Sequence, residues 1–151
     1  MMGIIAKVES QVILALDVGL KRIGVAKCIN GIPLCLKPIL RKNRNQAANA
    51  VRALIVESKA NVLVVGIPFL DCNASSQTND SISAMQKRIK HFVGLLELES
   101  HIQIAFLDEA FSSKEALDKL SDKKMRKKAH SKDGTLDSLA ALVILERYLM
   151  G

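Results

Sequence analysis

Three carboxylates stand where acidic side chains are unfavourable unless they bind something. Asp17 directly follows the apolar run 12–16, and Glu109 ends the segment 101–109. Asp137 lies near the start of the apolar segment 136–149. A charged group in apolar surroundings costs free energy unless it is paired or bound to a cation. Carboxylates brought together would form a site for a divalent metal, and Mg²⁺ or Mn²⁺ is the expected cofactor because both accept hard oxygen ligands.

Each of the three also has a simpler interpretation. Asp17 could end a strand in a turn, Glu109 could face solvent, and Asp137 could favour the N-terminus of a helix through the helix dipole. The carboxylates therefore indicate a functional site only when they are considered together with the positive charge elsewhere in the chain.

Positive charge is concentrated in one segment. The net charge is +7, and residues 122–132 hold six Lys or Arg against one Asp. Taken alone, such a run could be a solvated loop. Together with acidic groups that hold metals, it predicts contact with a phosphate backbone. The residues expected to bind nucleic acid in this run are Lys123, Lys124, Arg126, Lys127 and Lys128.

Length and composition limit the class of protein. A chain of 151 residues with 49% hydrophobic residues fits a single globular domain, which we take as 1–151. It has no apolar run long enough for a membrane span and no secretory leader at its start. Its three cysteines lack Cys-x-x-Cys spacing. These features predict a soluble cytoplasmic protein without membrane contact.

The elements that must position the carboxylates follow from periodicity. Apolar runs at 12–16, 23–29 and 32–39 predict three antiparallel strands, with Asn30-Gly31 as a hairpin turn. Helical spacing predicts helices at 45–59, 78–98 and 136–149, and a capping box predicts a short helix from Ser112. Strands are expected at 61–68 and 101–109.

This order predicts an α/β fold with a central mixed five-stranded sheet, three antiparallel strands followed by two parallel ones, flanked by helices. Functional groups of such sheets collect at the carboxyl ends of the strands. Asp17 and Glu109 both lie at such ends and would meet if the first and last strands are adjacent or nearly so.

Four short motifs, in order and spread over nearly the whole chain from about residue 12 to 149, resemble the YqgF/RuvX family. They are DVGLKRIGVA at 17–26, VGIP at 65–68, DE at 108–109 with FSS at 111–113, and DSLAA at 137–141. The resemblance implies a ribonuclease H-like fold and a nuclease proposed to act in 5′-end maturation of pre-16S rRNA or, by similarity to RuvC, on Holliday junctions.

The resemblance also implies roles for single residues. The acidic residues of the family fall on Asp17, Glu109 and Asp137, as catalytic and metal-binding groups. Lys21 and Arg22 would reach phosphate. The enzyme would be a hydrolase of ester bonds using two metal ions, with Asp17 shared between them.

The expected partner is nucleic acid, either pre-rRNA or branched DNA, with the ribosome or its precursors as a further partner. Both a monomer and a homodimer stay open, since symmetric cutting of a junction would need two-fold symmetry. The chain departs from the family at Ala110, where an arginine is usual, and in the stretch 69–73 after Pro68. These departures bear on how the substrate is positioned.

Two other classes of protein are alternatives to a nuclease. A non-catalytic nucleic-acid-binding module would keep the fold, but it would not need all three acids. An ATPase of the sugar-kinase or actin type needs two such lobes, and a P-loop needs Lys-Ser/Thr where this chain has Val25-Ala26.

Overall fold

The computed structural model of the protein describes residues 11–110 and 135–151. In these ranges five strands form one sheet in the order β3-β2-β1-β4-β5. The strands are β1 (Val12–Val18), β2 (Arg22–Ile29), β3 (Ile32–Leu40), β4 (Val62–Ile67) and β5 (Gln103–Asp108). β1, β2 and β3 are antiparallel, whereas β4 pairs parallel with both β1 and β5. The predicted mixed sheet is confirmed.

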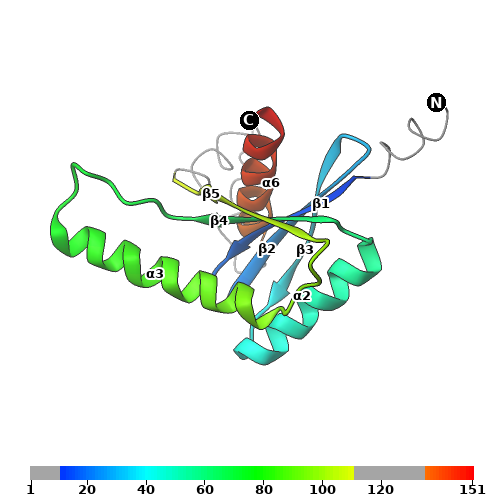
Figure 1. Ribbon diagram of the computed structural model, residues 1–151, viewed down its shortest axis with the longest axis horizontal. Helices are drawn as coiled ribbons and strands as arrows, with labels where there is room; N and C mark the ends of the chain where they lie inside the picture. The colour runs from blue at the N-terminus through cyan, green and yellow to red at the C-terminus, as the bar shows by residue number, and fades with distance from the viewer. Residues whose placement is uncertain (1–10, 111–134) are drawn as a thin grey trace.

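Helices cover both faces of this sheet (Figure 1). α2 (Arg44–Ser58) and α3 (Ser76–Leu95) lie on one face, and α6 (Thr135–Met150) crosses the other. The short helix expected from residue 112 falls outside the described residues. None of the helices in the described ranges has the length and apolar character needed to cross a membrane.

Local sequence explains where these elements begin and turn. Asn30 and Gly31 have φ values of 54° and 80°, the left-handed pair that a tight hairpin turn requires, and they join β2 to β3. Asn43 caps α2 in a reciprocal capping box with Gln46. Ser75 caps α3 by accepting a hydrogen bond from the amide of Thr78.

Alternation along β1 divides the core into two layers. Leu14 and Leu16 are fully buried against the residues of α2 and α3. Ile13 and Ala15 pack instead with buried residues of α6. Because side chains of a strand alternate between the two faces, Asp17 belongs to the face that α6 covers.

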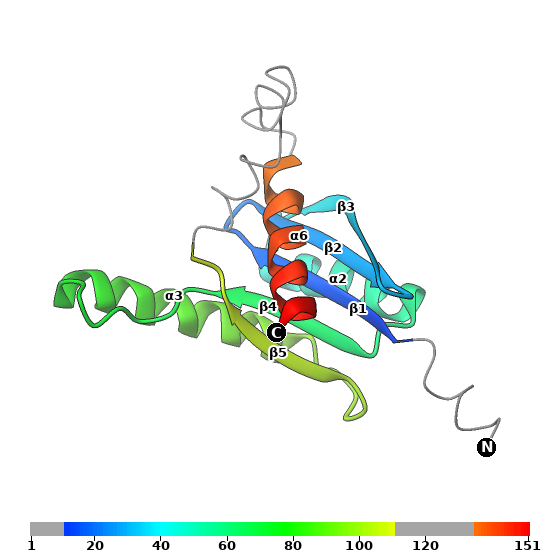
Figure 2. The same cartoon turned by 90° about the horizontal axis from the view of Figure 1, so that it is seen from above.

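α6 approaches this face closely where it begins. A Cβ atom added to Gly24 would lie 1.9 Å from the carbonyl oxygen of Asp137, so only glycine fits there. Next to this contact, the buried Ser138 hydroxyl donates to the carbonyl of Leu36 at 2.8 Å and accepts from the amide of Val25 at 3.4 Å. These contacts fix the start of α6 over β2 and β3, as the view in Figure 2 shows.

The contact at Gly24 makes a direct prediction about stability. Gly24→Ala should lower the free energy of unfolding by roughly 2–3 kcal/mol, since α6 must move away from β2. Gly94→Ala is the matched control, because a Cβ at Gly94 meets nothing within 4 Å and alanine favours the helix by about 0.5–1 kcal/mol. Thermal and urea unfolding would test both; equal stability of Gly24→Ala and wild type would contradict the close packing.

Candidate active site

Asp17 lies between two glycines on the face under α6. It pairs directly with Gly24 of β2. On its other side the register of β1 with β4, in which Leu16 faces Val65, brings Gly66 next to it. With no side chain on either flank, the Asp17 carboxylate has room on a face that is otherwise closed by a helix.

Gly66 also lets the carboxylate of Glu109, which directly follows β5, reach the carboxylate of Asp17 on β1. β4 separates these two strands in the sheet. A Cβ added to Gly66 would come within 2.4 Å of Cδ1 of Ile144 and 3.2 Å of Cβ of Glu109. The space that a side chain of β4 would fill is therefore shared by α6 and Glu109.

Asp17 and Glu109 share a hydrogen bond across this space. Burial, together with the negative charges of Glu109 and Asp137 and the hydrogen bond to Glu109, raises the pKa of Asp17 to about 7. Burial likewise raises the pKa of Glu109; the hydrogen bond from Asp17 opposes this, while the charge of Asp108 adds to it. Asp17 is therefore protonated in part of the molecules at neutral pH, and in that form it donates a hydrogen bond to Glu109.

Asp137 is near this pair but is bonded elsewhere. Its Oδ2 accepts a hydrogen bond of 2.9 Å from Nε of Arg22, forming a half-buried ion pair. Within residues 11–110 and 135–151, no three His, Cys, Asp or Glu side chains are gathered closely enough to hold one metal ion. The structure thus brings two of the three predicted carboxylates together and holds the third beside them on Arg22.

Arg147 of α6 fixes the backbone on both sides of Glu109. Its Nη1 donates to the carbonyl of Asp108 and its Nη2 to the carbonyl of Ala110, each at 2.8 Å. The amide of Glu109 itself donates to the carbonyl of Ile67 at 2.9 Å. Arg147 therefore supplies the bracing of this loop that the arginine usual at the position of Ala110 could have given.

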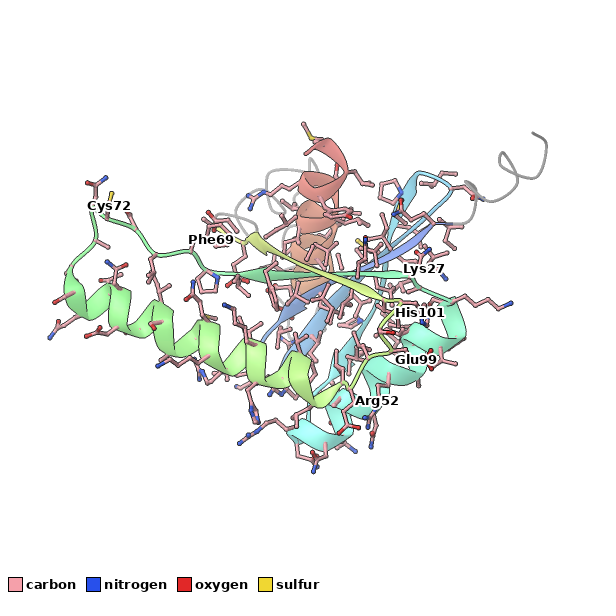
Figure 3. All side chains as sticks on the ribbon, viewed as in Figure 1. Lys27, Arg52, Phe69, Cys72, Glu99 and His101 are labelled. Atoms are coloured by element: carbon pink, nitrogen blue, oxygen red, sulfur yellow. The ribbon has the colours of Figure 1, made fainter. Side chains whose placement is uncertain are left out.

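A cavity of about 750 Å³ opens next to the carboxylate pair. Asp17, Glu109 and Ala110 line one side of it, the segment 68–72 lines another, and Ile82 and Met85 of α3 are also part of its wall. Figure 3 shows Phe69 and Cys72 on the long connection between β4 and α3. Residues 69–72 thus shape the space beside the two carboxylates.

The remaining predicted residues are placed as follows. Lys21 is exposed in the turn between β1 and β2, whereas Arg22 is engaged with Asp137. Asp108 is two residues after Phe106, whose side chain packs towards α2 and α3. Because side chains alternate along a strand, Asp108 lies on the same side as Phe106 and faces away from α6. The five basic residues of the run 122–132 lie outside the described residues.

Sequence reasoning missed two residues on which the site depends, Gly66 and Arg147. A glycine inside the fully buried strand 62–67 was a usable signal, because glycine in a strand often marks a close approach. Arg147 gave no comparable signal, since an arginine in the last turn of a helix is common.

The donor set suits a hard divalent cation. Asp17 and Glu109 offer carboxylate oxygens at one place and share a proton there. A cation bound between them would replace that proton and remove the repulsion between the two charges. These oxygens match the preference of Mg²⁺ and Mn²⁺, whereas Asp137, paired with Arg22, would have to move to add a further oxygen.

The chain is similar to known proteins over nearly its whole length. The family model RuvX, described as Holliday junction resolvase, matches residues 11–151. A Campylobacter lari protein named "Putative pre-16S rRNA nuclease" is 47% identical over 136 residues, which cover 89% of this chain and 94% of that protein. A Helicobacter pylori protein of the same name is 46% identical over 137 residues, covering 90% of this chain and 93% of that protein.

Solved structures show the same fold at low sequence identity. RuvC of T. thermophilus in complex with a Holliday junction substrate has a TM-score of 0.52 and 12% identity, over 93% of this chain and 95% of that one. The fowlpox virus resolvase bound to Holliday junction DNA has a TM-score of 0.53 and 11% identity, over 93% and 100%. The predicted ribonuclease H-like fold is confirmed.

The shared proton predicts how stability depends on pH in protein freed of metal by chelation. Because the pKa of Asp17 is raised on folding from 3.8 to about 7, the folded state binds the proton more tightly, and the unfolding free energy falls as pH rises between these values. Asp17→Asn should therefore stabilise the protein at pH 8 by roughly 1–3 kcal/mol and have little effect near pH 4.

Melting temperatures from pH 4 to 8 would test this. The exposed Asp80 of α3 provides the control Asp80→Asn, which should show no such gain. A gain for Asp17→Asn that is largest at pH 4 would contradict the shared proton.

The fork of Arg147 predicts a local effect on Glu109. Arg147→Gln should speed hydrogen exchange of the Glu109 amide by roughly 10-fold, because both flanking carbonyls lose their donor. Arg147→Lys should keep only part of the protection of the Glu109 amide, because one ammonium group does not reproduce the forked geometry of the guanidinium.

Arg52→Gln is the matched control. Arg52 of α2 also donates to a carbonyl, that of Leu95, and Figure 3 shows it on the other side of the sheet from α6. If exchange at Glu109 responded equally to both substitutions, Arg147 would have no specific role in bracing this loop.

Proposed function

Because this chain belongs to the RuvX family, we propose that it is a cytoplasmic, divalent-metal-dependent endonuclease that hydrolyses phosphodiester bonds of structured nucleic acid. The observation that carries the proposal is the half-buried pair Asp17 and Glu109, joined by a hydrogen bond beside an open cavity of about 750 Å³. Two half-buried carboxylates held side by side destabilise a fold, so their presence at a cavity favours a role in binding and catalysis.

The cation would be held by Asp17 and Glu109, with Asp137 joining them by leaving its ion pair with Arg22. When bound, it would supply Lewis-acid activation of the phosphodiester and of the attacking water, and two ions would serve both attacking and leaving oxygens. Mg²⁺ and Mn²⁺ fit this donor set.

The protein's own groups would then position the substrate. Arg147 fixes the loop that carries Glu109, so this carboxylate keeps its place while the bond is cut. Arg22, once released by Asp137, becomes a donor for a phosphate oxygen at the same place. Lys21 in the adjacent turn adds a second cation.

The substrate we propose is the precursor of 16S rRNA, cut near its mature 5′ end, with the ribosome precursor as the setting. The relatives at 46–47% identity, with their shared name, support this choice. The second candidate is resolution of Holliday junctions, which the description of the matched family favours. Both substrates present the same phosphodiester to the same carboxylates.

Cleavage assays separate these roles. End-labelled precursor rRNA leader and a synthetic four-way DNA junction would be incubated with Mg²⁺, Mn²⁺ or chelator. We expect metal-dependent cutting of the leader, lowered by about 100-fold or more in Asp17→Asn and Glu109→Gln because each loses a ligand charge. Asp108→Asn should lose far less activity. Asp108 lines the same cavity, but its Oδ1 accepts a hydrogen bond from the Ala110 amide, and asparagine can keep that contact.

Cutting of the junction but not the leader would assign the second role. Tight, salt-sensitive binding without metal-dependent cutting of either substrate would overturn the enzyme and leave a non-catalytic binding module. Equal loss of activity in Asp108→Asn and Asp17→Asn would overturn the assignment of the site.

A further inference from the structure

A second groove, rich in positive charge, lies beside the candidate active site on the face of the sheet that carries α2 and α3. Its volume is about 490 Å³. Arg41 at the end of β3 and Arg44 at the start of α2 line one side, and Lys87 and Arg88 of α3 line the other. None of the described residues that line it is acidic.

This gathering of cations is unfavourable for the protein alone. Burial lowers the pKa of Arg41, and the nearby positive charges of Arg44 and Arg88 lower it further. The N-terminus of α2 begins at Arg44 and adds the positive end of a 15-residue helix to the same place. Folding gains nothing from such a cluster, whereas an anionic ligand would be attracted to it from several directions.

Arg41 connects this groove physically to the loop that follows Asp17. Its Nη1 donates to the carbonyl of Gly19 at 2.8 Å, and its backbone amide donates to the carbonyl of Lys21 at 2.8 Å. The guanidinium lies over the ring of Phe92, 5.1 Å from its centroid. These contacts hold Arg41 in place, so the positive charge at this position is preorganised and does not need to be ordered on binding.

The groove and the cavity at the carboxylates adjoin one another. Val18 and Met85 line both of them. Asp17 points to the face under α6, whereas the groove lies on the opposite face, so the path between them passes over the carboxyl end of β1. Leu20 is 72% exposed in the turn at this end and offers an apolar surface beside the path.

From this arrangement we propose that the groove lined by Arg41, Arg44, Lys87 and Arg88 binds the phosphate backbone of the nucleic acid strand that is cut at Asp17 and Glu109. The strand crosses the carboxyl end of β1 at the turn 19–21, with one phosphate at the carboxylates and the following ones in the groove. This rests on the proposed function, which it extends by giving the strand a path.

The spacing of charges fits a backbone better than a single phosphate. The cations come from three separate elements on both sides of an open groove, so no single pocket encloses one anion. Leu20, an exposed apolar side chain in the lining of the groove, suits the sugars and bases of a strand. A nucleic acid strand presents both features in alternation.

The test measures binding apart from cutting. Fluorescence anisotropy would follow a labelled precursor rRNA leader and a labelled four-way DNA junction in chelator over a range of salt concentrations. The double variant Arg44→Gln/Arg88→Gln should bind at least one probe roughly 10-fold more weakly at moderate salt. The slope of log affinity against log salt should fall by about 1.4–1.8, the value for two lost phosphate contacts.

The matched control is Lys27→Gln/Lys59→Gln, which removes the same number of charges. Figure 3 shows Lys27 towards the end of the sheet away from Phe69 and Cys72, and Lys59 is the C-cap of α2, at the end far from Arg44. This variant should bind like wild type. Because Arg41 also has structural contacts, it is left unchanged, and thermal melts would confirm that both double variants fold.

Each outcome separates the groove from the nuclease itself. If the groove variant and the control bind alike, the groove proposal is overturned, whatever the cleavage assays give. If the groove variant binds weakly although neither probe is cut by wild type with metal, the groove stands and the enzyme fails. Where cutting occurs, the groove variant should raise KM while kcat changes little, since its residues position the strand and do not touch the reacting atoms.

Discussion

The close approach of α6 to the sheet is the constraint on which the site depends. Gly24 and Gly66 flank Asp17 on β2 and β4, and α6 lies against both, through the backbone of Asp137 and the side chain of Ile144. A side chain at either glycine would push the helix away or fill the space between the carboxylates. Gly24, Asp17 and Gly66, which lie side by side across three strands, therefore determine how α6 packs and how Asp17 reaches Glu109.

The half-buried carboxylates of Asp17 and Glu109 stay side by side because rigid elements hold them. Asp17 stands within a strand that is paired on both sides, and Glu109 follows a strand whose end is tied to α6 by Arg147. On the opposite face the cations of the groove are crowded in a similar way. One end of the sheet thus holds a cluster of carboxylates and, on its other face, a cluster of cations. This arrangement suits a ligand that carries phosphate and binds together with a metal ion.

Much of this could be read from the sequence, and the limits have physical causes. The strands and helices followed from periodicity, and the position of Asp17 and Glu109 at strand ends followed from the α/β pattern. The sequence did not show that β4 lies between their strands, because strand order depends on tertiary packing. The role of Gly66 follows only from that order and register, and the groove exists only because α2 and α3 bring Arg44 and Arg88 together.

The position of α6 in the chain has a consequence for synthesis. Every strand of the sheet precedes it, yet it contributes Asp137, covers Ile13 and Ala15, and ties down the end of β5 through Arg147. A nascent chain that ends before residue 135 can pair its strands but leaves an apolar face uncovered and its carboxylates unbraced. Completion of the site is therefore delayed until the final helix has left the ribosome and docked, so that a partly synthesised chain lacks the assembled centre.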